Sequence, residues 1–198
     1  MSHQIRTYSP APDVLHVHAV TEEGARMSSG ALTFRTLHFA GREIPCGLIG
    51  GIGTDPEYRR GGLVREIFSE MARECQNRSV PLTVLHPFSF AYYRKFGFER
   101  VADHRVLEFP ITALSFTPRF PDLTRAHGSE DSESLATVYN AFAADGRHLM
   151  PKRTPSHFPT EDGKKKVYLS RDGDGRPDGY IILELENYFA KVVGDAED

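Results

Sequence analysis

Three arginines and two glycines lie within seven consecutive residues, in a pattern that suits the binding of an anion. They are Arg59, Arg60, Gly61, Gly62 and Arg65. Guanidinium groups donate forked hydrogen bonds to phosphate oxygens, and glycines let an anion approach the main chain closely. A helix is predicted to begin directly afterwards, so its unpaired N–H groups and its dipole would add attraction for negative charge. The segment therefore predicts a pyrophosphate site, with an ordinary exposed turn as the alternative on these residues alone.

The segments around this turn predict the elements that would position it. Apolar residues recur at helical spacing from Leu63 to Cys75, with charged residues on the other face. The preceding apolar segment 47–54 contains four glycines, which predicts a strand with a β-bulge or one that a ligand approaches closely. Residues 80–86 predict a short buried strand. A short helix is expected next, with Ser89 as N-cap and Gly97 just past its end. Neither a Walker sequence nor a G-x-G-x-x-G fingerprint occurs, which argues against a P-loop or Rossmann nucleotide site.

In this order of elements the chain resembles the GNAT superfamily of acetyl-CoA-dependent N-acetyltransferases, and more narrowly the Eis-like (enhanced intracellular survival) acetyltransferases. The motifs that carry the resemblance are Pro56–Arg60, Gly62–Arg65, Leu85–Ser89 and Tyr93–Gly97. The resemblance covers roughly residues 40–110 and implies an α/β (α+β) fold with a mixed, mostly antiparallel sheet flanked by helices. It also implies an acyltransferase that uses acetyl-CoA as acetyl donor, with no metal.

The resemblance further implies a role for each matched residue. Backbone groups of Ile52, Gly53 and Thr54 would bind the pantetheine arm as an added strand. The pyrophosphate would lie in the turn formed by Arg59, Arg60, Gly61, Gly62, Leu63, Val64 and Arg65. Phe88 and Ser89 would flank the arm near the thioester, and Tyr93 would be the catalytic acid.

The chemistry of acetyl transfer explains why a tyrosine is suitable. A thiol has a pKa near ~8.5 and a tyrosine near ~10, so Tyr93 could donate a proton to the departing thiolate. A main-chain amide in the bulged strand could stabilise the developing oxyanion. The alternative for Tyr93 is a core or rim tyrosine that packs beside Tyr92. Tyr92 and Phe96 share one face of the predicted helix, which leaves Tyr93 on another.

The chain departs from the family's layout at both ends. The first strand is predicted at 4–8, and Ser9–Pro12 follows it without a helical pattern. The next strands are predicted at 13–20 and 32–39. The two helices that usually shape the acceptor pocket are therefore expected to be absent.

The second part of the chain predicts a partial second GNAT-like unit. It would begin with a helix at 129–144, with Ser129 as N-cap and an apolar stripe of Leu135, Val138, Tyr139 and Phe142. A hairpin of 166–169 with 179–184 would follow. We place the division between a cofactor-binding domain, 1–115, and this second unit, 116–198. In the Eis-like acetyltransferases, which are longer, the general base is the carboxylate of the chain's own C-terminus, so no base is assigned here. Whether the second unit replaces the missing helices, and whether the chain is a fragment, stay open.

Other candidate sites are less consistent with the sequence. Counted as a calcium loop from Asp172, the sixth residue is Pro177 and the twelfth is Leu183, which favours a hairpin turn over calcium. His16 and His18 lack nearby ligands with metal-binding spacing. His86 could relay a proton or be structural. The two cysteines, Cys46 and Cys75, have no adjacent base that would support a covalent route.

Composition limits the class of partner. The net charge is −3 over 198 residues, which argues against a nucleic-acid binder and suits a small amine-bearing substrate. No signal peptide, spanning stretch or lipidation motif occurs, so we expect no membrane association and a cytoplasmic protein. A homo-oligomer is left open. The acceptor class suggested by the Eis-like resemblance is an aminoglycoside-like molecule, a polyamine or another small cationic amine, acetylated by direct attack in a ternary complex. The rival hypothesis is a non-catalytic CoA-binding or regulatory module.

Overall fold

The computed structural model describes residues 2–102, 107–110, 112, 123–147, 149–158, 160, 165–186 and 189–193. It forms two compact units. Unit 1 contains Met1–Asp103 and Leu149–Pro151, and unit 2 contains His104–His148 and Lys152–Asp198. The predicted division between residues 115 and 116 lies outside the described residues and stays a prediction.

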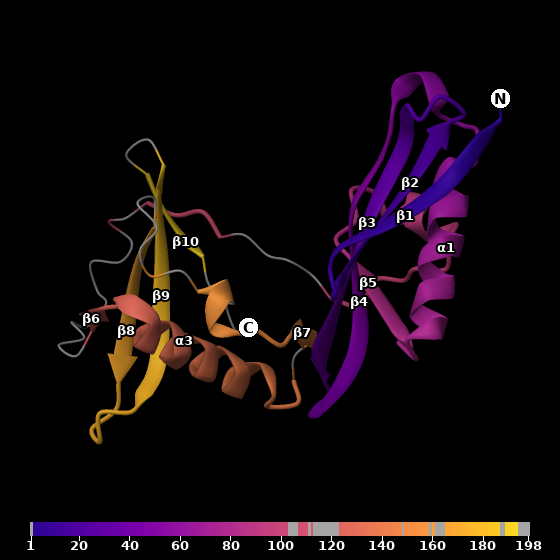
Figure 1. Cartoon of the computed structure of the whole chain (residues 1–198). Coiled ribbons are helices and arrows are strands. Elements are labelled where there is room, and N and C mark those ends of the chain that lie inside the picture. The colour runs from indigo at the N-terminus through magenta and orange to yellow at the C-terminus, as the bar shows by residue number, and fades with distance from the viewer. Residues whose placement is uncertain are drawn as a thin grey trace. The chain divides into compact units, whose positions relative to one another are not determined.

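Unit 1 is built on a mixed, mostly antiparallel sheet, as predicted (Figure 1). Its strands run in the order β1 (His3–Ala11), β2 (Val14–Thr21), β3 (Arg26–Phe39), β4 (Arg42–Thr54) and β5 (Leu82–Leu85), and β7 (Leu149–Pro151) pairs with β3. Every pair in this sheet is antiparallel except β4 with β5. The prediction for β3 began too late, because the strand already starts at Arg26.

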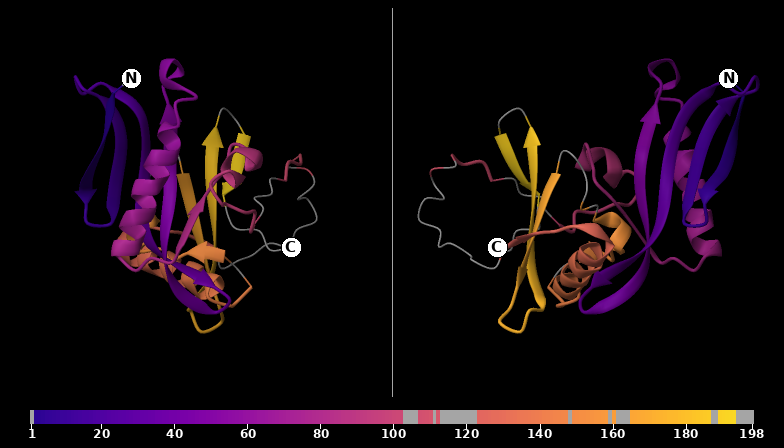
Figure 2. Two further views of the ribbon diagram at one scale, coloured as in Figure 1. Left: turned by 90° about the vertical axis from the view of Figure 1, so that its right-hand side faces the viewer. Right: turned by 60° about the vertical axis from the view of Figure 1, so that its left-hand side comes forward.

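One face of this sheet is covered by α1 (Leu63–Asn77), which follows β4 after the short helix η1 (Pro56–Tyr58) (Figure 2). The predicted apolar stripe is confirmed at Leu63, Val64, Ile67, Met71 and Cys75, which are buried, whereas Phe68 is partly buried and Ala72 is exposed. Ile67, Met71 and Cys75 pack with buried sheet residues that include Leu15, Val17, Leu32 and Ile49. Leu63, at the start of the helix, packs with Ala19 and Met27. This core fixes the start of α1 against the sheet and so fixes the turn that precedes it.

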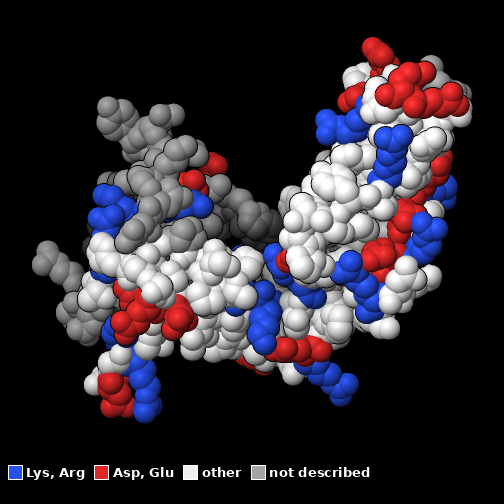
Figure 3. All heavy atoms as spheres, viewed as in Figure 1, with Lys and Arg blue, Asp and Glu red and all other residues white. Residues whose placement is uncertain are grey.

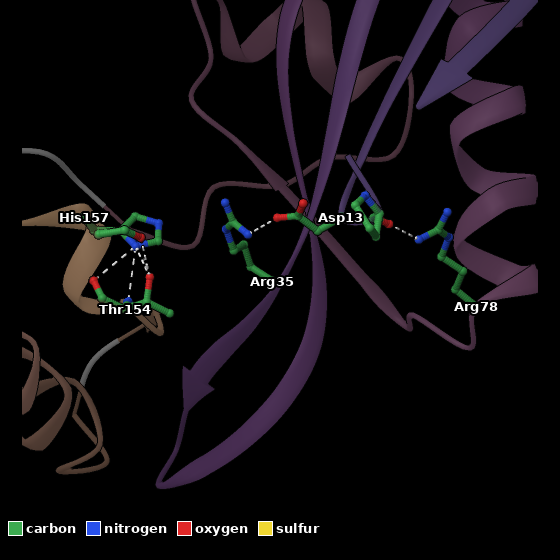
Figure 4. A network of polar contacts seen from close by, with 7 residues as sticks. Asp13, Arg35, Arg78, Thr154 and His157 are labelled. Atoms are coloured by element: carbon green, nitrogen blue, oxygen red, sulfur yellow. Dashed lines mark hydrogen bonds and ion pairs between the residues drawn. The ribbon is translucent and has the colours of Figure 1, made fainter. Parts of the chain in front are cut away.

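A tight turn joins β1 to β2, where the resemblance would place two helices. Phe34 N–H donates to the Asp13 carbonyl at 2.7 Å, and the Asp13 carboxylate pairs with Arg35 on β3. From the end of α1, Arg78 donates to the Pro12 carbonyl at 2.8 Å (Figure 4). Within the continuous stretch 2–102 no helix lies between these strands, as predicted.

Unit 2 contains the predicted helix and hairpin. Its sheet has the order β10 (Phe189–Val193), β9 (Pro177–Glu186), β8 (Lys165–Arg171), β6 (Thr124–Arg125). The helix α3 (Gly128–Ala143) follows β6 along the chain and precedes the other three strands. In the β8–β9 turn the Asp172 carboxylate accepts the N–H groups of Asp174 and Arg176, which is the hairpin role that we predicted. A short helix η3 (Pro155–His157) is capped by reciprocal bonds of Thr154 and His157 (Figure 4).

Two details of α3 were predicted wrongly. The helix begins at Gly128, so Ser129 lies inside the first turn instead of capping it. The cap residue is His127, whose N–H donates to the carboxylate of Asp131 at 2.7 Å. The buried face consists of Leu135, Ala136, Tyr139 and Ala143, whereas Val138 and Phe142 are only partly buried.

Charged side chains of both signs alternate along the outer edge of unit 1 (Figure 3). On α1 they include the ion pairs Glu70–Arg73 and Glu74–Arg78. In the described part of the chain, no helix is long and apolar enough to cross a membrane.

Candidate functional site

The strand β4 has an edge that is only partly paired. On one side it pairs with β3 as far as Thr54, but on the other side β5 pairs only with Cys46–Ile49. β5 ends at Leu85, the partner of Ile49, and among the described residues, residues 50–54 have a strand partner on the β3 side alone. A β-bulge lies here, because Gly51 and Ile52 stand opposite the single residue Gly30 of β3. The predicted bulge is thus confirmed, and the φ of +61° at Gly51 shows why a glycine is needed there.

The glycines of β4 fall into two groups. A Cβ added to Gly47 would lie 2.6 Å from Leu32 Cδ1, so the packing of the core requires this glycine. A Cβ added to Gly50 or Gly53 would meet no protein atom within 4 Å. Glycine in a strand interior is destabilising, so its use without a packing reason is typical of a place where a ligand comes close.

Hydrogen bonds define which backbone groups face the open edge. The Gly53 carbonyl accepts from Ser28 Oγ at 2.8 Å, and Asp55 N–H donates to the Met27 carbonyl at 3.0 Å. Both groups therefore point toward β3. Because successive backbone groups in a strand alternate between its two edges, Thr54 and Ile52 point to the open edge. There the Thr54 carbonyl accepts from Arg59 Nε at 3.3 Å. Of the three predicted strand contacts, Ile52 and Thr54 are the two that offer backbone groups on this side.

The turn before α1 has the conformation of an anion-binding loop. Arg60 and Gly62 both adopt left-handed φ values, +67° and +83°. Gly62, in the left-handed conformation, is followed by residues of the right-handed helix. Such an alternation of left- and right-handed residues directs successive backbone N–H groups into one concavity, where an anion can bind. Gly62 is the N-cap and no side chain caps the helix, while Arg65 N–H turns back to the Gly62 carbonyl at 2.9 Å. The remaining first-turn N–H groups therefore point outward without a side-chain cap.

The side chains of this turn divide into anchors and exposed cations. Leu63 and Val64 are 4% and 9% exposed, so only their backbone could reach a ligand. Arg59, Arg60 and Arg65 are exposed. The Arg65 guanidinium lies 5.5 Å from the centre of the Phe96 ring, and Phe96 follows the helix that carries the predicted acid.

That helix is α2 (Phe90–Arg94), and its predicted N-cap, Ser89, is confirmed. Its predicted end is wrong, because the helix ends at Arg94 with Lys95 as C-cap, so Gly97 does not directly follow it. Ser89 Oγ accepts from Tyr92 N–H at 3.3 Å, so its hydroxyl is used in holding the helix. Phe88 is 73% exposed, with its ring 5.3 Å from that of Tyr93. Tyr92 packs on Phe96 at 5.4 Å, as the helical spacing predicted.

Tyr93 itself is 5% exposed and lies among aromatic rings. They belong to Phe68, Phe88, Tyr92 and Phe98. Burial raises the pKa of the Tyr93 phenol above its ordinary value, and the neighbouring Tyr92 raises this pKa further. A phenol that stays protonated is suited to donating a proton, and the same packing would also suit a structural tyrosine.

Other groups have no evident catalytic arrangement. Among the described residues, no group of three or more His, Cys, Asp or Glu side chains could hold a metal ion. Cys46 and Cys75 are buried and unpaired, and burial raises the pKa of the Cys46 thiol to about 11. A high thiol pKa opposes a covalent acetyl-cysteine route. The general base stays unassigned.

One polar contact of the site was missed in the sequence. Ser28, only 2% exposed, joins Gly53 and Thr54 of β4 through its hydroxyl. The pair Ser28-Ser29 before Gly30 resembles a turn in sequence, and only the long-range partner in β4 reveals its function.

Comparisons with known proteins agree with this architecture. The model of the family described as "Acetyltransferase (GNAT) domain" matches residues 3–101. No curated protein matches the chain. A probable N-acyltransferase from Enterococcus faecalis V583 has a TM-score of 0.71 at 16% identity, covering 94% of this chain and 56% of its own. A GCN5-related N-acetyltransferase from Kribbella flavida has a TM-score of 0.70 at 18% identity, and the match covers 91% of this chain and 47% of the Kribbella chain. A GCN5-related N-acetyltransferase from Anabaena variabilis ATCC 29413 has a TM-score of 0.66 at 21% identity, and the match covers 86% of this chain and 44% of the Anabaena chain. The chain thus spans about half the length of these solved structures and shares their fold.

Proposed function

We propose that this chain transfers acetyl from acetyl-CoA to a primary amine. The chain belongs to the acetyltransferase (GNAT) domain family, because that family's model matches half of its 198 residues. The observation that supports this proposal most directly is the geometry of β4. Within the described residues its edge has no strand partner beyond Ile49, and it carries glycines that the packing of these residues does not require.

The residues fit acetyl-CoA in two places. The pantetheine arm contains two amides, which would pair with the backbone of Ile52 and Thr54 as a strand pairs with a sheet edge. The pyrophosphate would lie at Gly61–Val64, where outward N–H groups, the helix dipole and three exposed arginines combine. Because a carbonyl oxygen has two lone pairs, the Thr54 carbonyl can accept an N–H of the arm beside Arg59 Nε, and the terminal N–H groups of Arg59 stay available for the phosphates.

Bound acetyl-CoA would supply the thioester that the amine attacks. Tyr93 would donate a proton to the departing thiolate, and its raised pKa keeps that proton in place at neutral pH. Phe88, exposed beside Tyr93, would shield the reacting end of the arm from water. Ser89 would contribute by holding α2, since its hydroxyl already caps that helix. A backbone N–H at the bulge would stabilise the developing oxyanion.

The acceptor belongs to a separate part of the proposal. The Eis-like resemblance of Pro56–Arg60 and Tyr93–Gly97 favours a small cationic amine of the aminoglycoside or polyamine type, attacked directly in a ternary complex. The tight β1–β2 turn removes the usual helical wall of an acceptor pocket, and this observation favours the rival hypothesis of a non-catalytic CoA-binding module.

A thiol-release assay against a panel of amines tests the proposal. We expect free CoA to appear at a rate that depends on the amine, with polyamines and aminoglycosides among the active acceptors. Saturable acetyl-CoA binding without amine-dependent thiol release would support the binding module instead. Absence of binding would contradict both.

A further inference from the structure

A chain of hydroxyl groups runs across β3 and β4 at the proposed pantetheine edge. Ser28 Oγ lies 2.8 Å from the Gly53 carbonyl oxygen and 2.8 Å from Thr54 Oγ1. Ser28 is 2% exposed, so water does not compete freely for these contacts. A buried hydroxyl network of this kind is costly unless each member is satisfied.

Proton counting fixes the direction of this network. A carbonyl oxygen can only accept, and Ser28 has one hydroxyl proton, so that proton goes to Gly53. The contact between Ser28 and Thr54 then requires Thr54 to donate. Thr54 Oγ1 is left with acceptor lone pairs alone.

The same residue is held from its other side. The Thr54 carbonyl accepts from Arg59 in the turn that precedes α1. Thr54 therefore joins the open strand edge to the proposed pyrophosphate turn, and its conformation depends on Ser28 through both the paired hydroxyl and the neighbouring Gly53 carbonyl.

We propose that Ser28 is a positioning residue for acetyl-CoA: through its hydrogen bonds to Gly53 and Thr54 it holds the pantetheine edge of β4 in register and makes the Thr54 hydroxyl an acceptor for an N–H of the ligand. This inference rests on the proposed function. It gives β3, a strand outside the sequence motifs, a role in the affinity for the cofactor. It gives β3 no role in the chemical step.

The test compares Ser28→Ala with Ser29→Ala, a matched control whose side chain makes no described hydrogen bond. The affinity for acetyl-CoA is measured by calorimetry, and KM is measured by thiol release. ADP has the pyrophosphate but no pantetheine arm, and its inhibition constant is measured by displacement of acetyl-CoA. We expect Ser28→Ala to raise the Kd and KM for acetyl-CoA roughly 3- to 10-fold, as the loss of one or two hydrogen bonds would. We expect kcat to change less than about twofold and the ADP constant to stay unchanged, because the turn is intact.

Substitutions of Thr54 complete the cycle. Thr54→Ser should retain the affinity of the unmodified chain, whereas Thr54→Val should weaken it as Ser28→Ala does. The double variant Ser28→Ala with Thr54→Val should be no weaker than either single variant, because the two residues act through one network.

The outcomes separate the two proposals. If the unmodified chain does not bind acetyl-CoA, the proposed function fails and this inference falls with it. If the unmodified chain binds and Ser28→Ala binds equally well, only the inference is overturned. If Ser28→Ala weakens acetyl-CoA and ADP by the same factor, Ser28 is merely structural and the positioning role is also overturned.

Discussion

Two glycines of the same strand should respond in opposite ways to one added methyl group. In Gly47→Ala the new Cβ would lie 2.6 Å from Leu32 Cδ1 and 3.2 Å from Thr83 Cγ2. Carbon atoms pack at about 3.5–4.0 Å, and Leu32 is fully buried, so neither strand can yield without strain. Overpacking of this kind costs about 1–3 kcal/mol of unfolding free energy. For a unit of this size, each kcal/mol lowers the Tm by roughly 4–8 °C.

In Gly53→Ala the new Cβ meets no protein atom within 4 Å, and the backbone has no left-handed φ. We expect stability to be unchanged or raised by up to about 1 kcal/mol, because alanine restricts the unfolded chain. We also expect acetyl-CoA binding to weaken by about tenfold, ~1.4 kcal/mol, because the methyl group occupies space left for the ligand. Urea denaturation and calorimetric titration of the two variants measure these quantities. Gly53→Ala with full affinity for acetyl-CoA would refute the argument that this glycine serves a ligand.

Two further predictions concern the tyrosine and the cysteines. Tyr93→Phe should lower kcat for a good amine by roughly 10²-fold or more without weakening acetyl-CoA binding, since the ring contacts with Phe68 and Phe98 are kept. Because burial raises the pKa of Tyr93, the unmodified enzyme should keep its acid protonated to a higher pH than a free phenol would, and steady-state pH profiles that show an earlier loss of the acid would contradict the role. Cys46, with a pKa of about 11, should have about one thiolate in a thousand at pH 8, so a thiol reagent should label it only after unfolding; rapid labelling of the native chain would contradict the burial.

The sequence was sufficient where local pattern determines structure. The helical spacing from Leu63 to Cys75 predicted α1, because burying one apolar face is what holds such a helix on a sheet. Ser89 was recognised as a cap because its hydroxyl satisfies an N–H three residues later in the same segment. The bulge was visible in the glycines of residues 47–54, since few other residues tolerate the left-handed φ at Gly51.

Long-range contacts explain what the sequence did not predict. Ser28 is a small polar residue that resembles part of a turn, and it belongs to a strand only because β4 supplies its partners. Ser129 was a reasonable cap on composition, but the Asp131 carboxylate reaches back to His127 and the helix begins one residue earlier. In α3 the alanines at 136 and 143 are buried in place of two larger apolar residues, because tertiary packing selects the buried face.

The measurement that tests the central claim most directly is a calorimetric titration of the chain with acetyl-CoA, beside Arg60→Glu. Arg60 is exposed in the turn before α1, so the substitution should leave the fold intact while placing a carboxylate where a phosphate would bind. The account predicts saturable binding by the unmodified chain and its loss in the variant. No binding by the unmodified chain, or equal binding by both, would contradict the assignment of β4 and this turn as the acetyl-CoA site.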